Sequence, residues 1–340
     1  MDQTDQSSFS RRMMLAGLGA VPLVAAGVMQ SAAQTVVSAT SAEAPVRAAL
    51  KAAKGTKLVI LGTGAGPVPM VPRRHRFMTS HVMLSNGAAY VLDFGLGVTN
   101  QFARTGISFE ALRSLFITHH HPDHNIEYGP FLVIGWIGGM PLTVKAYGPP
   151  PLKQMTAGFL DAWRTTVDFW AEDFKMKPLH GLDVTEISAA EPVMQDENVK
   201  VSAIIVNHPP VKPALGYRFD FRDRSIAFSG DTTPLEAVAR MARGADMLVH
   251  EAMILPAVEA SLRAAVANGS AVNFDAAMAH MRADHSPVED VGRIAQEAGV
   301  KTLVLSHLTP SDGVKNETWR AGAAKAFKGK IIVAHDLMVL

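Results

Sequence analysis

The side chains best suited to chemistry lie in one short run of the sequence, His119-His120-His121-Pro122-Asp123-His124. In an extended segment His119 and His121 point to the same side, so both imidazoles can bind one metal ion. Where the chain turns into the following helix, Asp123 and His124 can face a second ion. The negative charge of Asp123 suits a metal pair that holds a hydroxide. An expression tag does not explain a run at this internal position, and we predict a metal centre.

Further histidines and carboxylates follow apolar stretches later in the chain. They are His208 in Asn207-His208-Pro209-Pro210, Asp231 in Ser229-Gly230-Asp231-Thr232, Glu251 in Val249-His250-Glu251-Ala252, His285 in Asp284-His285-Ser286-Pro287, and His307 in Leu305-Ser306-His307. Considered alone, each has a simpler explanation. Asp231 could cap the next helix, and His208 or His307 could be a buried histidine. Glu251 could be solvated at a strand end, and His285 could merely precede a helix N-cap at Ser286.

Alternating strands and helices must position these residues. Short apolar runs bounded by turn residues predict strands at 57–61, 81–84, 89–93, 115–118, 142–147, 199–206, 215–221, 225–229, 247–250, 302–306 and 331–334. Helices are expected near 96–104, 152–169, 235–243, 256–267, 274–281, 288–298 and 317–327. We therefore expect one domain made of two halves rich in strand–helix units. The glycine turn at residues 62–66 is not a dinucleotide fingerprint, because Pro67 stands where the third glycine is needed.

Composition narrows the chemistry further. The 340 residues are 48% hydrophobic, which is enough for a large α/β core and argues against a disordered chain. The absence of cysteine excludes disulfides, thiolate metal sites and cysteine nucleophiles. Thirteen histidines remain, so metal chemistry must use imidazole and carboxylate ligands. With 32 basic and 31 acidic residues, the chain has no overall charge typical of a nucleic-acid binder.

The first residues have the features of an export signal. Arg11-Arg12 precedes an apolar run over residues 13–29, and Ser31-Ala32-Ala33 offers small residues for cleavage. The arginine pair resembles a twin-arginine signal, although an uncleaved membrane anchor is the alternative. We expect a signal peptide at 1–33, a flexible lead-in at 34–54 and one large folded domain at 55–340. The mature protein would then be periplasmic or secreted, without stable membrane insertion.

Residues 57–335 resemble the metallo-β-lactamase superfamily, and within it the branch of ribonuclease Z and related arylsulfatases. The histidine run, the loop at 61–66 and the stretch Leu92-Asp93-Phe94-Gly95-Leu96-Gly97 carry the resemblance, although Phe94 and Leu96 depart from the usual residues. The later histidine and carboxylate motifs occur in the family's order. The resemblance implies a four-layer αββα sandwich with the metals at one edge.

The resemblance also implies roles for individual residues. One Zn²⁺ ion would be bound by His119, His121 and His208, a second by Asp123, His124 and His307, with Asp231 shared between them. The catalytic residues would be Asp123 at the metals, His285 as the proton donor to the leaving group, and Glu251 as the residue that orients His285. Histidine suits proton transfer because its ordinary pKa lies near working pH.

The metals do not choose the substrate, because a bridging hydroxide can attack phosphodiesters, sulfate esters, lactones and amides. We expect a small, partly hydrophobic ester, either a sulfate ester or a phosphodiester. Nucleic acid is not expected, because of the export signal, the balanced charge and the lack of a basic arm within 148–200. The alternatives are a ribonuclease Z-like phosphodiesterase acting on nucleic acid, a lactonase or β-lactamase, and an iron-dependent dioxygenase. Residues 253–281 could be core or could cover the site, and a homodimer is left open.

Overall fold

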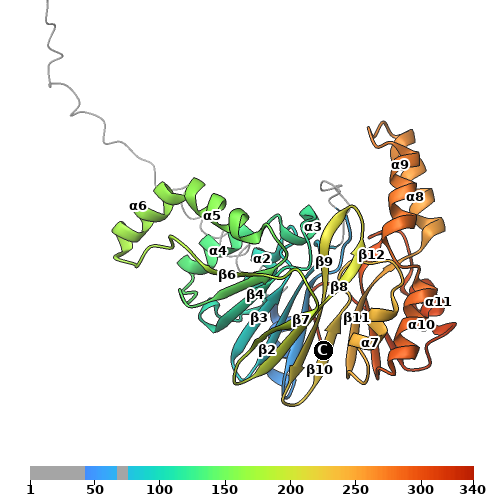
Figure 1. The fold of residues 1–340 in the computed structure, drawn as a ribbon, viewed down its shortest axis with the longest axis horizontal. Coiled ribbons are helices and arrows are strands. Elements are labelled where there is room, and N and C mark those ends of the chain that lie inside the picture. Colours follow the sequence, from blue (N-terminus) through green and yellow to red (C-terminus); the bar gives the residue numbers. More distant parts are fainter. Residues whose placement is uncertain (1–42, 67–75) are drawn as a thin grey trace, which may run out of the picture. The chain divides into compact units, whose positions relative to one another are not determined.

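Two mixed sheets, each of seven strands among the described residues, form the centre of the computed structural model (Figure 1). The structure describes residues 43–66 and 76–340, and Pro45–Leu340 form one unit. In the first sheet the order is β14 (Met338–Val339), β1 (Lys57–Gly62), β2 (Ser80–Ser85), β3 (Ala88–Leu92), β4 (Leu112–Phe116), β5 (Lys145–Gly148) and β6 (Asp183–Glu186). In the second it is β13 (Lys330–Val333), β12 (Thr302–Thr309), β11 (Met247–Met253), β10 (Ser225–Phe228), β9 (Val211–Phe221), β8 (Val199–His208) and β7 (Glu191–Gln195).

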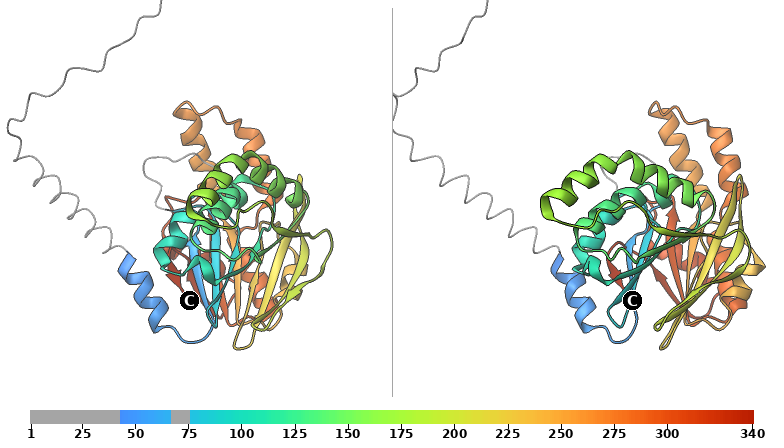
Figure 2. Two further views of the ribbon diagram at one scale, coloured as in Figure 1. Left: turned by 90° about the vertical axis from the view of Figure 1, so that its left-hand side faces the viewer. Right: turned by 60° about the vertical axis from the view of Figure 1, so that its left-hand side comes forward.

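Alternating side chains along these strands build the layers. In β3, for example, Tyr90 faces the second sheet, whereas Val91 packs under the outer helices, because successive side chains point to opposite faces. The cluster between the sheets joins residues such as Phe116 and Phe219. Outer clusters attach α2 (Val98–Thr105), α4 (Tyr128–Ile137), α5 (Leu152–Ala162) and α6 (Arg164–Phe174) to the first sheet, and α7 (Glu236–Met241), α10 (Val288–Ala298) and α11 (Asn316–Ala324) to the second. The predicted αββα sandwich is confirmed; Figure 2 shows its layers from two further sides.

Strand directions bring the chemical motifs to one edge. β3, β4 and β5 run parallel, and so do β10, β11 and β12. β8 runs in the same direction as β10, because both are antiparallel to β9. The segments that follow β4, β8 and β10 therefore meet with the ends of β11 and β12.

The structure differs from the sequence-based expectations in several places. The apolar segment 128–137 forms the helix α4, and residues 338–339 form β14, neither of which was among the expected elements. Residues 45–52, expected within a flexible lead-in, are helical, and Val46 and Leu50 are buried in the outer cluster of the first sheet. The helix expected at 152–169 is two helices, α5 and α6, which meet at Trp163. β6 and β7 were not predicted. Both are edge strands with few buried side chains, so they lack the apolar pattern that identifies a strand.

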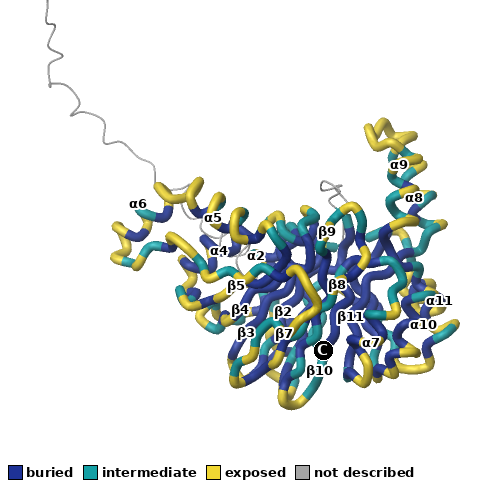
Figure 3. Tube along the Cα trace, viewed as in Figure 1, coloured by how far each residue is buried: buried dark blue, intermediate teal, exposed yellow. Residues whose placement is uncertain are grey.

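Two helices form a hairpin between β11 and α10. α8 (Leu255–Ala267) and α9 (Phe274–Asp284) pack on each other around Val258 and Met278. The ends of the hairpin are attached next to one another: the N–H of Met253 donates to the carbonyl of Ser286 at 2.9 Å. The tip is exposed (Figure 3).

The expected signal peptide at 1–33 lies outside the described residues. Within the part of the chain that the structure describes, no helix is long and apolar enough to cross a membrane.

Candidate metal centre

The segment after β4 carries the histidine run into the site. His121 is extended, and α3 (Pro122–Asn125) begins directly after it with proline at its first position. This change from extended chain to helix places Asp123 and His124 in the first helical turn, where both are buried.

His119, His121 and His208 form the first cluster. Nε2 of His119 lies 3.1 Å, and Nε2 of His208 3.0 Å, from Nδ1 of His121. His208 donates from Nδ1 to the backbone carbonyl of Asp284 at 3.0 Å, which leaves the lone pair of Nε2 facing the cluster. Burial lowers the pKa of His121, that of His208 to about 4, and that of His119 well below its usual value. The first cluster is therefore a set of neutral imidazoles, the form that binds a metal ion.

Asp123, His124 and His307 form the second cluster. Nε2 of His307 lies 3.2 Å, and Nε2 of His124 3.8 Å, from Oδ2 of Asp123. His307 sits in a bulge of β12, where the register with β11 shifts, and its φ of 46° is left-handed. A strained residue of this kind is held in place by its surroundings, and here the bulge turns the imidazole into the cluster.

Asp231 lies between the two clusters. Its Oδ2 is 3.3 Å from Nε2 of His124, 3.1 Å from Nε2 of His307 and 4.0 Å from Nε2 of His119. The preceding Gly230 has a φ of 62°, and a Cβ there would lie 2.3 Å from the carbonyl oxygen of Leu215. Only glycine allows this approach. Asp231 does not cap α7, which begins at Glu236.

Asp93 was not assigned a role from the sequence. Its Oδ2 accepts from Nδ1 of His124 at 2.9 Å, and its Oδ1 accepts from the N–H of Thr118 at 2.8 Å. This bond fixes the proton of His124 on Nδ1 and turns Nε2 toward Asp231. The sequence did contain one indication of this role, because Asp93 stands at the end of a predicted apolar strand.

Carboxylates dominate the electrostatics of the second cluster. Burial disfavours a charged His124, but Asp231, Asp93 and Asp123 outweigh it and raise its pKa well above the usual value. Burial likewise opposes ionisation of Asp231, yet His307 and His124 lower its pKa well below the usual range. These carboxylates form an anionic site suited to a cation.

His285 and Glu251 form a pair beside the clusters. Nδ1 of His285 lies 2.8 Å from Oε2 of Glu251, and Oε1 of Glu251 accepts from the N–H of Thr232 at 2.7 Å. Burial raises the pKa of Glu251. For His285 burial acts in the opposite direction, but the Glu251 carboxylate raises its pKa to about 9. Glu251 is buried, so it is not a solvated strand end, and Ser286 does not cap α10, whose N-cap is Pro287.

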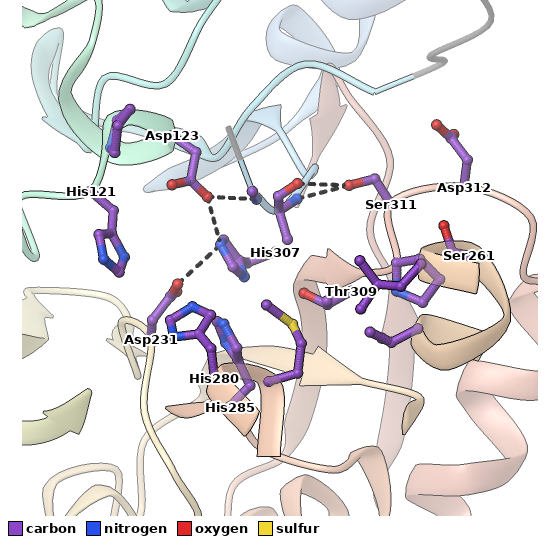
Figure 4. A pocket seen from close by; sticks show the side chains of 17 residues that line it. His121, Asp123, Asp231, Ser261, His280, His285, His307, Thr309, Ser311 and Asp312 are labelled. Atoms are coloured by element: carbon purple, nitrogen blue, oxygen red, sulfur yellow. Dashed lines mark hydrogen bonds and ion pairs between the residues drawn. The ribbon is translucent and has the colours of Figure 1, made fainter. Parts of the chain in front are cut away.

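A pocket of about 480 Å³ opens onto both clusters (Figure 4). His121, Asp123, Asp231, His285 and His307 line its inner side. His280 of α9 lies beside His285, with ring centroids 5.7 Å apart, and pairs with Asp284 one turn later. His280 was not assigned a role from the sequence. Its i, i+4 spacing from Asp284 was the available signal.

The donor set fits a divalent metal ion. Five groups of ligand-type side chains each bring their donor atoms within 4.8 Å of one another: His119, His121 and His208; His119, His124 and Asp231; Asp123, His124 and His307; His208, Asp231 and His285; and Glu251, His285 and His307. Imidazole and carboxylate ligands without thiolate are typical of zinc hydrolase sites. Moreover, the buried Nε2 of His124 has no hydrogen-bond partner among the described residues.

Comparisons with known proteins agree with this geometry. The model of the Beta-lactamase superfamily domain matches residues 90–308. A ribonuclease Z from Mycobacterium sp. (strain KMS) is 31% identical over 288 residues, which cover 83% of this chain and 94% of that protein. The metallo-β-lactamase fold protein YhfI from Bacillus subtilis superposes with a TM-score of 0.62 at 18% identity, over 84% of this chain and 99% of YhfI. The short form of human tRNase Z gives 0.58 at 20% identity, over 84% and 98%.

One expectation about partners is wrong. We did not expect nucleic acid as a substrate, but relatives that match most of this chain are named ribonuclease Z. The expectation used the charge balance of the whole chain, whereas phosphate recognition depends on the local field. Cations bound among these carboxylates would be the largest local charges.

The family match also confirms the predicted class of enzyme. The αββα fold and the convergence of histidines and carboxylates at one site agree with this match. The chain belongs to the metallo-β-lactamase superfamily and is a metal-dependent hydrolase.

Proposed function

We propose that the protein hydrolyses phosphodiester bonds in RNA with two divalent metal ions, and that the metal is zinc. The observation that carries this proposal is the position of Asp231 between two clusters of ligand-type side chains. The proposed ligands are His119, His121 and His208 for one ion and Asp123, His124 and His307 for the other, with Asp231 shared. The ribonuclease Z relatives support RNA as the substrate class.

Two bound cations would polarise the phosphoryl group and lower the pKa of a water at the site. The chain's own residues orient the reactants. The N–H of Gly66 donates to Oδ2 of Asp123 at 2.6 Å and fixes this carboxylate, which we propose orients the attacking water. We propose that His285 donates the proton of its Nε2 to the leaving oxygen, since Glu251 occupies its Nδ1 side.

The pH profile tests the pair of His285 and Glu251. Because the pKa of His285 is raised to about 9, its acid form persists at neutral pH and is lost as the pH rises through that value. Glu251→Gln removes the negative charge that raises this pKa. We expect the alkaline limb of the kcat/KM profile to move to lower pH while zinc content stays constant. An unshifted limb would contradict the proposed proton transfer.

A substrate panel tests the function itself. The zinc-loaded protein should cleave a labelled RNA and bis(4-nitrophenyl) phosphate. His121→Ala should abolish this activity. The neighbouring His120→Ala is the matched control, because His120 contacts the carbonyl of Pro149 and belongs to neither cluster. A fully zinc-loaded protein that cleaves no phosphodiester would overturn the proposal.

A small, partly hydrophobic ester is the second candidate, because apolar side chains of the α8–α9 hairpin also line the pocket. Turnover of 4-nitrophenyl sulfate without turnover of either phosphodiester would favour it.

Export is a separate proposal that rests on Arg11-Arg12 and the apolar run at 13–29. We propose that residues 1–33 direct the protein to the periplasm or the medium. Cell fractionation with and without Arg11→Lys/Arg12→Lys tests this: both forms in the cytoplasm would contradict it.

A further inference from the structure

The pocket extends from the metal centre onto the α8–α9 hairpin. Val258 and Leu262 lie one turn apart on the same face of α8, and Met281 of α9 lines the same part of the pocket. Pro310, which follows β12, lines it as well. We call the part lined by Val258, Leu262, Met281 and Pro310 the hairpin pocket. It is apolar, whereas the inner side of the same pocket carries the histidines and carboxylates.

Several hydrogen bonds fix the hairpin relative to the metal centre. At its base, the N–H of Ile254 donates to the carbonyl of Thr309 at 2.9 Å. At its end, Asp284 pairs with His280 through its side chain and accepts from His208 through its backbone carbonyl. Asp284 thus links the end of α9 to the first cluster, and its carboxylate holds the imidazole of His280 at the border of the pocket. The base of the apolar wall is therefore attached to one of the proposed metal ligands.

Charge limits what the hairpin pocket can accept. Among the described residues, no lysine or arginine lines the pocket, and Asp312 stands on its side away from the clusters (Figure 4). A second anionic group would meet the Asp312 carboxylate there, and Arg76, whose charge interacts with Asp312, is not among the lining residues. An uncharged, apolar group meets no such electrostatic repulsion when it enters the hairpin pocket, and its apolar surface is removed from water.

We propose that the hairpin pocket binds a flat organic ring of the substrate while the phosphoryl group to which the ring is joined lies at the metal centre. This inference rests on the proposed phosphodiesterase function and deepens it. The ring could be an aryl ester or the base of a nucleotide, which share a flat, largely apolar face. The hairpin pocket then selects substrates that carry such a ring, and the metal centre performs the hydrolysis.

Binding to two pairs of non-hydrolysed ligands tests the proposal. Calorimetry of the zinc-loaded protein compares phenylphosphonate with methylphosphonate, and uridine 5′-monophosphate with ribose 5-phosphate. In each pair the charged group is shared and only one ligand has a flat, unsaturated ring. We expect the ring to improve Kd by about tenfold in at least one pair, from the burial of its apolar surface. The first pair measures the contribution of an aryl ring to binding, and the second measures the contribution of a nucleobase.

Leu262→Gln should reduce this ratio of Kd values toward one without changing methylphosphonate binding. Val266→Gln is the matched control, because Val266 lies one turn further along α8, is 41% exposed and is not among the pocket's lining residues. Ser261→Trp provides a second variant: Ser261 is exposed and lines the pocket, so a larger side chain there should fill the space and exclude the ring.

Ratios near one in both pairs, or ratios unchanged in both Leu262→Gln and Ser261→Trp, would overturn the ring pocket. If phosphodiester hydrolysis persists in that case, only this inference fails. If no phosphodiester is cleaved although the ring ratio is about tenfold, the proposed function fails and the pocket stands.

Discussion

The two clusters of the metal centre contain the same kind of side chain in opposite electrostatic surroundings. The first consists of three imidazoles whose pKa values burial lowers, so that they are neutral. In the second, three carboxylates surround His124 and raise its pKa. The first cluster is ready to bind a cation, whereas the second attracts a cation but must release a proton to bind it. Histidines in the two clusters therefore do not bind a cation under equal conditions.

The largest effect is expected at Asp231, the residue that both clusters share. Asp231→Asn removes a negative charge close to His119, His124 and His307. We expect loss of both zinc ions by elemental analysis and no detectable hydrolysis. Asp161→Asn is the control, because Asp161 is exposed and, within the described part of the chain, pairs with Arg164. Retention of two ions would show that the clusters bind independently of Asp231.

Single-ligand variants separate the clusters. His121→Ala should remove one zinc ion per chain and leave the second cluster loaded, and His307→Ala should do the reverse. The physical reason is that His121 lies among the donor atoms of the first cluster and His307 among those of the second. Native mass spectrometry measures the count. Loss of both ions from either variant, with an unchanged circular dichroism spectrum, would contradict the division into two clusters.

Asp93→Asn should weaken only the second cluster. Asn keeps an acceptor for Nδ1 of His124 but removes the charge that strengthens the bond. Loss of a partner of this kind lowers metal affinity by about 10–100-fold. Competition with a chelator should show one weakened ion and one unchanged ion, and the unchanged ion serves as the internal control. Equal weakening of both would place Asp93 in a general structural role.

The smallest expected effect is the release of a proton when a metal ion binds to the second cluster. A raised pKa means that His124 is protonated at neutral pH, so a metal ion must displace that proton, and affinity falls as the pH falls. The first cluster, with the pKa of His208 near 4, needs no such release above about pH 5. Calorimetry of His121→Ala and His307→Ala in buffers of different ionisation enthalpy should show proton release only when the second cluster is filled. Equal release from both would contradict the comparison.

The apolar, well-bounded runs predicted the central strands and two halves rich in strand–helix units, whereas the αββα sandwich was implied by the resemblance to the family. Each chemical motif follows a predicted strand, which favoured a role in the site, but the ligand sets were implied by the resemblance. The sequence placed Asp93 at the end of a predicted strand but did not show its contact with His124, and it could not predict Asp284, because both roles depend on which imidazole nitrogen each residue faces. Nor did it predict β6 and β7, whose polar residues fit an edge as well as a loop.

The partner expectation failed for a different reason. A net charge of +1 describes the whole surface, while the pocket combines carboxylates, imidazoles and an apolar wall within one cavity. Average composition contains no information about such a local arrangement.

The attachment of the α8–α9 hairpin has an evolutionary consequence. The chain leaves β11 at Met253 and returns beside it, where Met253 forms a bridge with Pro287. Residues 255–279, which precede His280 and His285, can therefore be lengthened, shortened or exchanged without moving Glu251 or residues 280–286, since the closure cost of a loop rises only slowly with its length. If this segment binds the ring as proposed, substrate preference can change through the hairpin alone, while the residues proposed to cleave the bond stay in place.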